Sequence, residues 1–545
     1  MATRVDAAAA LAERSVRRRS AGFSRPPPKA VAAGAVVVAL VVLLPTVYII
    51  VRASEGGAHD FISTLADGTA VALLLRTMAL AAAVTAGALV IGVPLAWLTT
   101  RTDLPGRRVF AVLTALPLVI PTYVGGYAFV AALGPRGLAQ GLLAPLGVER
   151  LPEIYGFFGA WLVLTLFTYP YVLLTVRAAV RRLDPALEEA GRALGRTDGE
   201  TFRRIVLPQL RPAATAGGLL VALYTIHDFG AVSLLRYDTF TRSIYVSYQG
   251  SFDRSRAAVL SLVLVALTIV VIALESRIRG RAAYFRSHAS APRQPRVRPL
   301  GRKRWPAFAA CSALVSVALL LPLSVISYWM IQSARQGAGI GRTLSAALNS
   351  VEASSLGAVL AVAAAWPIAV MTVRFPGRLA RATERASYTG YALPGLVVAL
   401  SLVFFGIRAA PALYQTLVLL VFAYIVLFIP QAEGPLRASL LQLNPALEEA
   451  SHSLGAGRYR TMGRIVLPLI RPGIAAGIAL VFLTAMKELP ATLLLAPTGF
   501  RTLATEVWSA TSASYFDRAA LPALAIVLAS SIPLAVLMFR ERETR

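Results

Sequence analysis

The sequence is divided by twelve stretches of about 20 residues that are largely apolar and carry few charges. A helix must supply about 20 such residues to cross a hydrocarbon core about 30 Å thick, because lipid offers the backbone no hydrogen-bond partners. A chain that is 57% hydrophobic and 15% charged is also far from the composition of a soluble domain. We therefore predict an all-α polytopic membrane protein with twelve transmembrane helices. The predicted spans are 30–51, 74–98, 109–132, 156–180, 213–235 and 256–275 in the first half and 306–331, 350–373, 387–407, 412–433, 473–495 and 519–539 in the second.

The formal net charge of +27 comes from arginines that lie mostly between these stretches. Clustered basic residues are typical of nucleic-acid binding. Here, however, they gather in the N-terminal tail, between the sixth and seventh spans, at the C-terminus and in the short loops after the second and eighth spans. The positive-inside rule assigns all of these to the cytoplasm, and an even number of spans agrees with that assignment. We predict cytoplasmic termini, a lipid bilayer around the helices and no nucleic-acid partner.

One charged segment occurs twice. The first repeated segment (184–212) and the second repeated segment (444–472) align without a gap, and 16 of their 29 positions are identical. The likeness continues outward, since PLAW at Pro94 is answered by WPIA at Trp366. Two six-helix halves of the same orientation should be related by an axis along the membrane normal, as in parallel-repeat transporters. The predicted parts are a basic cytoplasmic tail (1–29), a first six-helix domain (30–275), a basic cytoplasmic linker (276–305), a second six-helix domain (306–539) and a short tail (540–545).

Each repeated segment has the local signals of a short capped helix. Asp184 and Asn444 each precede a proline, which suits an N-cap followed by the first helical position. Gly195 and Gly455 suit the C-terminal cap, where glycine takes a left-handed conformation at little cost. Apolar residues recur at i, i+3 and i+7 and predict an apolar stripe, with Leu187, Ala190 and Leu194 in the first segment and Leu447, Ala450 and Leu454 in the second. A second helical stretch is expected to end at a Leu-Pro pair, so the product is a cytoplasmic helix-turn-helix that is present twice.

An amphipathic helix at the membrane surface would show a similar stripe. The spacing favours a more specific interpretation, because the pattern E-A-x-x-x-x-G-x9-I-x-L-P occurs in both halves with nothing inserted. It resembles the EAA loop of the permease subunits of binding-protein-dependent ABC importers. In that family the loop docks into a cytoplasmic ATPase subunit and transmits its closure to the transmembrane helices. The resemblance implies a fused permease that engages both subunits of an ABC ATPase dimer. The coupling residues it implies are Glu188, Glu189, Ala190, Gly195, Ile205, Leu207 and Pro208 in the first segment and Glu448, Glu449, Ala450, Gly455, Ile465, Leu467 and Pro468 in the second.

The chain lacks the motifs of an ATPase or a metalloenzyme. None of its three lysines follows a glycine, so it has no Walker A site to hold ATP phosphates. Its sequence has no HExxH motif and no Cys/His cluster that could hold zinc. We predict that the chain is not an enzyme and binds no cofactor, and that ATP and Mg²⁺ bind to the partner ATPase.

Two carboxylates occupy equivalent places in the fifth and eleventh spans. Asp228 and Glu488 lie 260 residues apart, near the predicted external ends of these spans. An ionisable group inside a span usually faces the bundle interior, a partner or water. One interpretation is that each is locally neutralised, Glu488 by Lys487 or an arginine, and serves packing. The other is that the pair lines the external half of a substrate pathway.

The segments 228–258 and 487–508, together with the fused layout, resemble the ferric-iron permeases of this importer class. The resemblance implies uptake across a bacterial inner membrane, with a periplasmic or tethered substrate-binding protein delivering iron. Thiamine, polyamine, sulfate and phosphonate permeases are close relatives, and two acidic residues would suit thiamine or spermidine as well as Fe(III). An ion-driven secondary transporter is the alternative from a different class.

Overall fold

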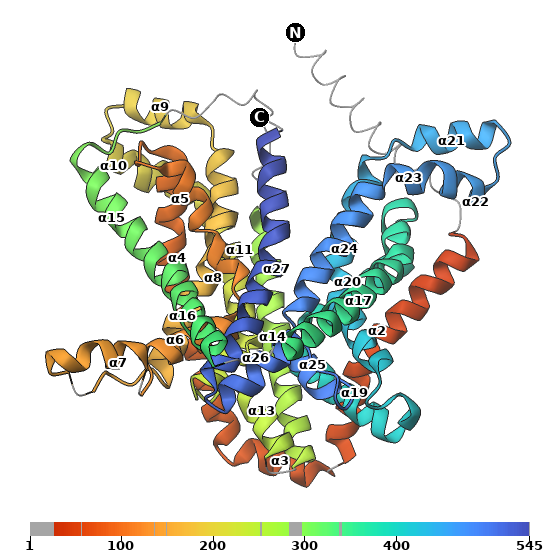
Figure 1. Cartoon of the computed structure of the whole chain (residues 1–545). Helices are drawn as coiled ribbons and strands as arrows, with labels where there is room; N and C mark the ends of the chain where they lie inside the picture. Colours follow the sequence, from red (N-terminus) through yellow and green to blue (C-terminus); the bar gives the residue numbers. More distant parts are fainter. Residues whose placement is uncertain are drawn as a thin grey trace. The chain divides into compact units, whose positions relative to one another are not determined.

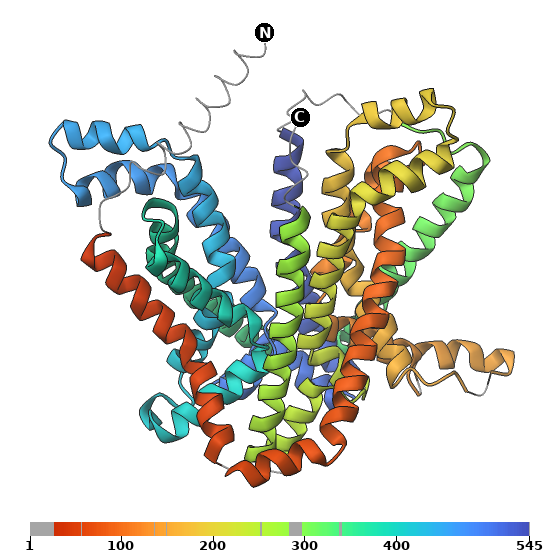
Figure 2. The same ribbon diagram turned by 180° about the vertical axis from the view of Figure 1, so that it is seen from behind.

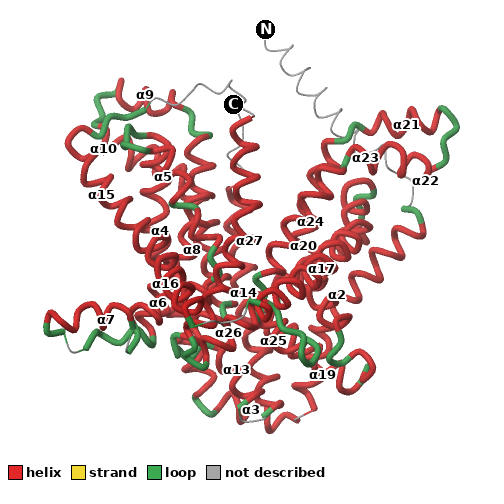
Figure 3. Tube along the Cα trace, in the orientation of Figure 1, coloured by secondary structure: helices red, strands yellow, loops and turns green. Residues whose placement is uncertain are grey.

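A computed structural model describes residues 27–55, 57–135, 137–148, 150–250, 253–282, 297–336 and 340–543. They form helices joined by turns, with a single isolated backbone bridge and no β-strand (Figure 3). Eight helices are long and apolar enough to cross a membrane, or up to eleven if each of three bent helix pairs is one span. The predicted all-helical polytopic fold is therefore confirmed, whereas the count of twelve spans stays a prediction.

The helices follow the apolar runs of the sequence closely (Figure 1). The first half contains α2 (Lys29–Glu55), α3 (Gly57–Ala66), α4 (Thr69–Arg101), α5 (Arg107–Leu113), the 3-10 helix η1 (Leu116–Val119), α6 (Thr122–Leu133), α7 (Leu138–Leu143), α8 (Phe157–Arg181), α9 (Pro185–Ala193), α10 (Asp198–Thr201), the π-helix η3 (Phe202–Val206), α11 (Leu207–His227), α12 (Gly230–Leu234), α13 (Phe240–Gln249) and α14 (Arg254–Ala282).

The second half has a similar order, but its described residues contain no counterpart of α3 or α7. It contains α15 (Arg304–Val315), the π-helix η6 (Ser316–Leu320), α16 (Leu321–Arg335), α17 (Gly341–Arg374), α18 (Arg378–Ala392), α19 (Gly395–Arg408), α20 (Leu417–Gln442), α21 (Pro445–Ser453), α22 (Arg458–Thr461), the π-helix η8 (Met462–Val466), α23 (Leu467–Leu469), α24 (Arg471–Met486), α25 (Pro490–Leu495), α26 (Leu503–Ser512) and α27 (Phe516–Glu543).

Two predicted spans, 109–132 and 387–407, are not straight helices. The helices on either side of the break are bent by 95° in the first case and by 97° in the second. Pro121 precedes α6 and Pro394 precedes α19, and the residue before each proline, Ile120 or Leu393, has an extended backbone. Proline disfavours the helical conformation at the position before it and lacks the amide that would continue the helix. Each of these two predicted spans is therefore a pair of helices joined by a sharp bend at a proline.

The predicted spans 213–235 and 473–495 are also interrupted. Helix α11 ends at His227, Asp228 is extended, and α12 begins at Gly230. Helix α24 ends at Met486, and α25 begins at Pro490. Each interruption falls at one of the two acidic residues predicted from the sequence. Asp228 and Glu488 therefore lie at breaks between two helices and not within a helix.

The described residues pack into two compact units that draw on both halves of the sequence. One unit comprises the chain up to Tyr48 with Val351–Leu393 and Ser401–Ala485, and the other comprises Ile49–Ser350, Pro394–Leu400 and the chain from Met486 onward. In the second of these, α4, α8 and α11 run side by side (Figures 1 and 2). Their close approach depends on small residues, since a Cβ on Gly92 of α4 would lie 2.9 Å from Val172 of α8. In the other unit α18 packs against α20.

Candidate functional site

The caps predicted for the repeated segments are present. The side chain of Asp184 accepts a hydrogen bond from the amide of Ala186 at 2.9 Å, and Asn444 accepts from Ala446 at 3.1 Å. Gly195 and Gly455 have positive φ angles of 79° and 77°. The amide of Arg196 donates to the carbonyl of Gly191 and that of Gly195 to Arg192, and Ala456 and Gly455 make the same pair of bonds to Ser451 and His452. These are Schellman caps, which end the two helices at the same point.

A small residue after the Glu-Ala pair lets the two helices of each segment pack closely. A Cβ on Gly191 would lie 2.6 Å from Cδ1 of Ile205, so glycine leaves room for that side chain. In the second segment the hydroxyl of the buried Ser451 lies 2.9 Å from that of Thr461. The isoleucine of the motif therefore serves packing within the segment.

The predicted apolar stripe is exposed. Leu187 and Leu194 are 48% and 79% exposed, and Leu447 and Leu454 are 46% and 88% exposed. The alanine and the second glutamate of each segment are also on the surface, namely Ala190, Glu189, Ala450 and Glu449. Apolar side chains that gather on the surface of a short, precisely capped helix are typical of a protein-binding surface. We name Leu187, Ala190 and Leu194, with Leu447, Ala450 and Leu454, the exposed edges of α9 and α21.

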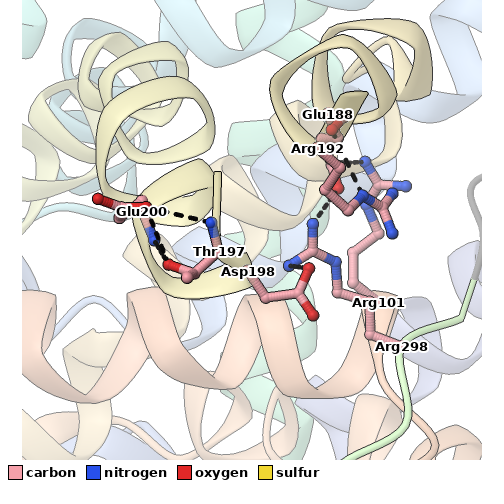
Figure 4. A network of polar contacts seen from close by, with 7 residues as sticks. All are labelled: Arg101, Glu188, Arg192, Thr197, Asp198, Glu200 and Arg298. Atoms are coloured by element: carbon pink, nitrogen blue, oxygen red, sulfur yellow. Dashed lines mark hydrogen bonds and ion pairs between the residues drawn. The ribbon is translucent and has the colours of Figure 1, made fainter. Parts of the chain in front are cut away.

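The first glutamate of each segment has a different environment from the second. Glu188 is buried, and its two carboxylate oxygens accept from Arg101 and Arg298, each at 2.6 Å (Figure 4). Arg101 is the last residue of α4, so this ion pair ties α9 to the end of a long membrane helix. Glu448 likewise accepts from Arg374, the last residue of α17, at 2.5 Å.

Arg101 and Arg374 were missed as site residues, because their charge was counted only as part of the positive-inside pattern. The signal that could have found them lies in the repeat itself. Both arginines stand seven residues after the shared proline of the PLAW and WPIA motifs, Pro94 and Pro367. A charge kept at one position in both halves, at the end of an apolar run, indicates a specific partner more than a general loop charge.

The predicted end of the second helical stretch at a Leu-Pro pair was wrong for the first segment, whereas in the second segment α23 ends at Leu469, one residue after the pair. In the first segment α10, η3 and α11 form one continuous run from Asp198 to His227. In the second segment the chain bends by 66° at Ile470, three residues after Leu467. A π-helix precedes the proline in both segments, and the amide of Leu207 donates to the carbonyl of Phe202 five residues earlier. This wider turn accommodates Pro208 and Pro468, which cannot donate to the helix ladder.

Hydrogen bonds hold the side chain of Asp228 at the helix break between α11 and α12. Its carboxylate accepts from the hydroxyl of Thr122 at 2.5 Å and from the amides of Ala231 and Val232 at 3.0 and 3.2 Å. Thr122 is the first residue of α6. The hydrogen bond from Thr122 therefore connects the segment between α11 and α12 to the start of α6. The side chain therefore caps α12 and fixes its position against α6.

Glu488 has a similar place in the second half. Its Oε1 accepts from the amide of Ala491 at 3.2 Å, and a Cβ on Gly395, the first residue of α19, would lie 2.6 Å from that oxygen. Lys487 does not neutralise it within the described part of the chain, because its Nζ donates to the carbonyl of Leu118 at 3.5 Å. Among the described residues there is no group of three or more His, Cys, Asp or Glu side chains that could hold a metal ion.

A polytopic helical protein with two copies of a capped surface segment anchored to membrane helices has the architecture of a transport permease. The chain belongs to the family of binding-protein-dependent transport system inner membrane components, whose model matches residues 88–282 and 357–540. It is thus a multi-pass inner membrane protein of an ABC importer, with two tandem permease domains, and such systems include an ATPase and a substrate-binding protein.

Curated relatives cover either the whole chain or one half. An Fe(3+)-transport system permease protein of Haemophilus influenzae, FbpB 2, is 37% identical over 91% of this chain and 95% of its own length. A probable molybdenum ABC transporter permease of Haloferax volcanii is 33% identical over 40% of this chain and 75% of its own length. The sulfate transport system permease CysT of Salmonella typhimurium is 29% identical over 35% of this chain and 70% of its own length.

Proposed function

We propose that this permease takes up ferric iron. The observation that carries the proposal is the similarity to the Fe(3+)-transport permease, which covers 91% of this chain and 95% of that protein at 37% identity. The molybdenum and sulfate permeases match only about one half of the chain at lower identity. A periplasmic or tethered binding protein would deliver the iron to the external face.

The proposed topology has twelve spans with both termini in the cytoplasm. The eight long apolar helices and three bent pairs would account for eleven spans if each pair crosses once, and the 28-residue α27 would supply the twelfth. The domain boundaries 30–275 and 306–539, flanked by the tails and the linker 276–305, follow from the same count. This topology puts both repeated segments and the basic linker in the cytoplasm, as the positive-inside rule requires.

In this proposal the exposed edges of α9 and α21 dock into the two subunits of an ABC ATPase dimer, where ATP and Mg²⁺ bind. Glu189 and Glu449 are on the surface beside these edges and are available to basic groups of the partner. Gly195 and Gly455 let each segment turn sharply enough to present its edge. Isoleucine, leucine and proline at the end of each motif hold the second helix of the segment, namely Ile205, Leu207, Pro208, Ile465, Leu467 and Pro468.

ATP binding would draw the two segments together, and two connections would carry that movement into the membrane. One is the ion pair of Glu188 with Arg101 at the end of α4, and of Glu448 with Arg374 at the end of α17. The other is the direct continuation of the first segment into α11. Rigid connections of this kind let a surface movement switch a pathway between inward-facing and outward-facing states.

We place the substrate pathway at the helix breaks between α11 and α12 and between α24 and α25. Asp228 and Glu488 lie there, but the carboxylate of Asp228 already accepts three hydrogen bonds and is 7% exposed. Such a group has little capacity left for a cation. Asp228 therefore serves the pathway by positioning α6 and α12, whereas the Glu488 carboxylate accepts from Ala491 beside the start of α19.

The test is uptake of radioactive Fe(III) by cells lacking this chain and by the same cells with the chain restored, with excess thiamine and spermidine as competitors. Restored uptake that neither competitor reduces is the expected result. Restored iron uptake that thiamine or spermidine abolishes would assign the permease to organic cations. A variant with both exposed edges changed to acidic residues is the matched control, since it should be inserted but inactive.

A further inference from the structure

The end of the linker is attached to the first repeated segment. Residues 297–300, here named the strap, lie along the turn that follows α4. The amide of Arg298 donates to the carbonyl of Arg101 at 2.8 Å, and the amide of Asp103 donates to the carbonyl of Arg298 at 3.1 Å. The amide of Leu300 donates to Oδ1 of Asp103 at 2.7 Å. Backbone pairing on both sides of Arg298 fixes where its side chain starts.

The side chain of Arg298 then reaches both helices of the first segment. It donates to Glu188 of α9 at 2.6 Å and lies 3.7 Å from Asp198 of α10 (Figure 4). Its guanidinium also lies over the ring of Trp97, 5.5 Å from the centroid, as that of Arg101 does at 5.7 Å. A planar guanidinium can satisfy two carboxylates and an aromatic face at once, which a lysine ammonium cannot. One residue of the linker thus joins α4, α9 and α10.

Trp97 extends the same contact to the π-helix, since its ring meets that of Phe202 edge-on with centroids 4.9 Å apart. The network therefore includes the end of α4, both helices of the segment and the start of the run into α11. Its two arginines face the carboxylates of Glu188 and Asp198.

The second repeated segment has different residues at the places of Trp97, Phe202 and Asp198, and it has no strap. Val370 stands at the place of Trp97, Met462 at that of Phe202 and Arg458 at that of Asp198. The linker occurs once in the chain, so it offers no second strap. Among the described residues Glu448 pairs with Arg374 alone, and its side chain is 25% exposed, compared with 7% for Glu188.

We propose that the strap is a component of the coupling apparatus and that Arg298 is a positioning residue, which holds the first segment rigidly to α4. This inference rests on the proposed docking of the repeated segments to the ATPase. It makes the two docking sites of the fused chain mechanically unequal, with a braced first segment and a more mobile second one. The linker then does more than connect the two halves, because it sets the stiffness of one of them.

The first readout is the mobility of each segment, which does not depend on transport. Spin labels are placed at Leu194→Cys or at Leu454→Cys in the full-length chain in lipid, with the native Cys311 changed to serine. Arg298→Ala is expected to shift the spectrum at position 194 toward a mobile label and to leave the one at 454 unchanged. The control is Arg302→Ala, which removes an exposed arginine of the same linker and should change neither.

The second readout is the number of ATP molecules hydrolysed per iron imported. Arg298→Ala should raise this ratio at least about fivefold, the lower end of usual coupling effects between sites. Arg298→Lys should give an intermediate value, because it keeps the charge but not the shared contacts. Asp198→Ala, which removes the contact to α10 alone, should move both readouts in the same direction as Arg298→Ala and serves if that variant fails to accumulate.

Equal label mobility in Arg298→Ala and Arg302→Ala would overturn the inference. An unchanged coupling ratio would overturn it as well, provided that bulky replacements of Gly195 and Gly455 do raise the ratio. If those glycine replacements also leave the ratio unchanged, the docking role itself is wrong, and the mobility readout still decides whether the strap braces the segment.

Discussion

Replacing Glu188 with glutamine should loosen α9 far more than the equivalent change of Glu448 loosens α21. Glutamine keeps the shape of the side chain and removes its charge. In the first segment it leaves the guanidinium groups of Arg101 and Arg298 together over Trp97 without their shared carboxylate. The side chains of Arg101 and Glu188 are 3% and 7% exposed. Removing one member of a buried ion pair costs about 3–5 kcal/mol.

In the second segment the same change leaves a single arginine in a wetter site. Arg374 and Glu448 are 9% and 25% exposed, so water can solvate part of the charge that remains. We expect a loss of about 1.5–3 kcal/mol, the range for a hydrogen bond to a charged group. With about 1.4 kcal/mol for each tenfold change, amide exchange in α9 should rise by roughly two orders of magnitude or more, and in α21 by roughly one to two.

The assay is hydrogen exchange of the full-length chain in lipid, read by mass spectrometry over α9 and α21. Glu189→Gln is the matched control, because it removes the neighbouring charge at an exposed position and should leave exchange in α9 unchanged. Equal or smaller acceleration in Glu188→Gln than in Glu448→Gln would refute the account of a buried, doubly bridged anchor.

Three further changes test other parts of the site. Gly195→Trp and Gly455→Trp force a bulky residue into a left-handed backbone, at a cost of roughly 1–2 kcal/mol. Each variant should stay in the membrane and uncouple ATP hydrolysis from iron uptake. Unchanged uptake in both variants would count against docking. Leu194→Glu combined with Leu454→Glu should prevent the ATPase from staying bound to the purified permease. The thermal unfolding of the permease should not change, since both leucines are largely exposed. A fully retained ATPase would show that the exposed edges are not the docking surface. Asp228→Asn should lower iron uptake at least about tenfold while the ATPase stays bound, because Nδ2 cannot accept the hydrogen bond that Thr122 donates to the carboxylate. Wild-type uptake would remove Asp228 from the pathway.

Features encoded by neighbouring residues were predictable from the sequence. The caps at Asp184, Asn444, Gly195 and Gly455 depend on bonds within about five residues, and all four form. The apolar runs predicted membrane helices for the same local reason. The exposed edge of each segment was visible as a stripe, although periodicity alone does not say whether a partner or the chain itself covers it.

Features that depend on distant partners were not predictable. The partner of Glu188 in α4 is 87 residues away, and its partner in the strap is 110 residues away. Nothing in the order EEAGR distinguishes the buried glutamate from the exposed one. The sharp breaks near Pro121 and Pro394 were not predictable, because a proline within an apolar run is compatible with a bent helix as well as an interrupted one.

The central claim is that ATP hydrolysis by a partner, transmitted through the two repeated segments, drives iron import through this chain. The most direct measurement is accumulation of radioactive Fe(III) in lipid vesicles that contain the chain, its ATPase and its binding protein. We predict accumulation only with ATP, the ATPase and the binding protein all present, and none when an ion gradient replaces ATP. Accumulation driven by an ion gradient in the absence of the ATPase would contradict the account and assign the chain to the secondary transporters.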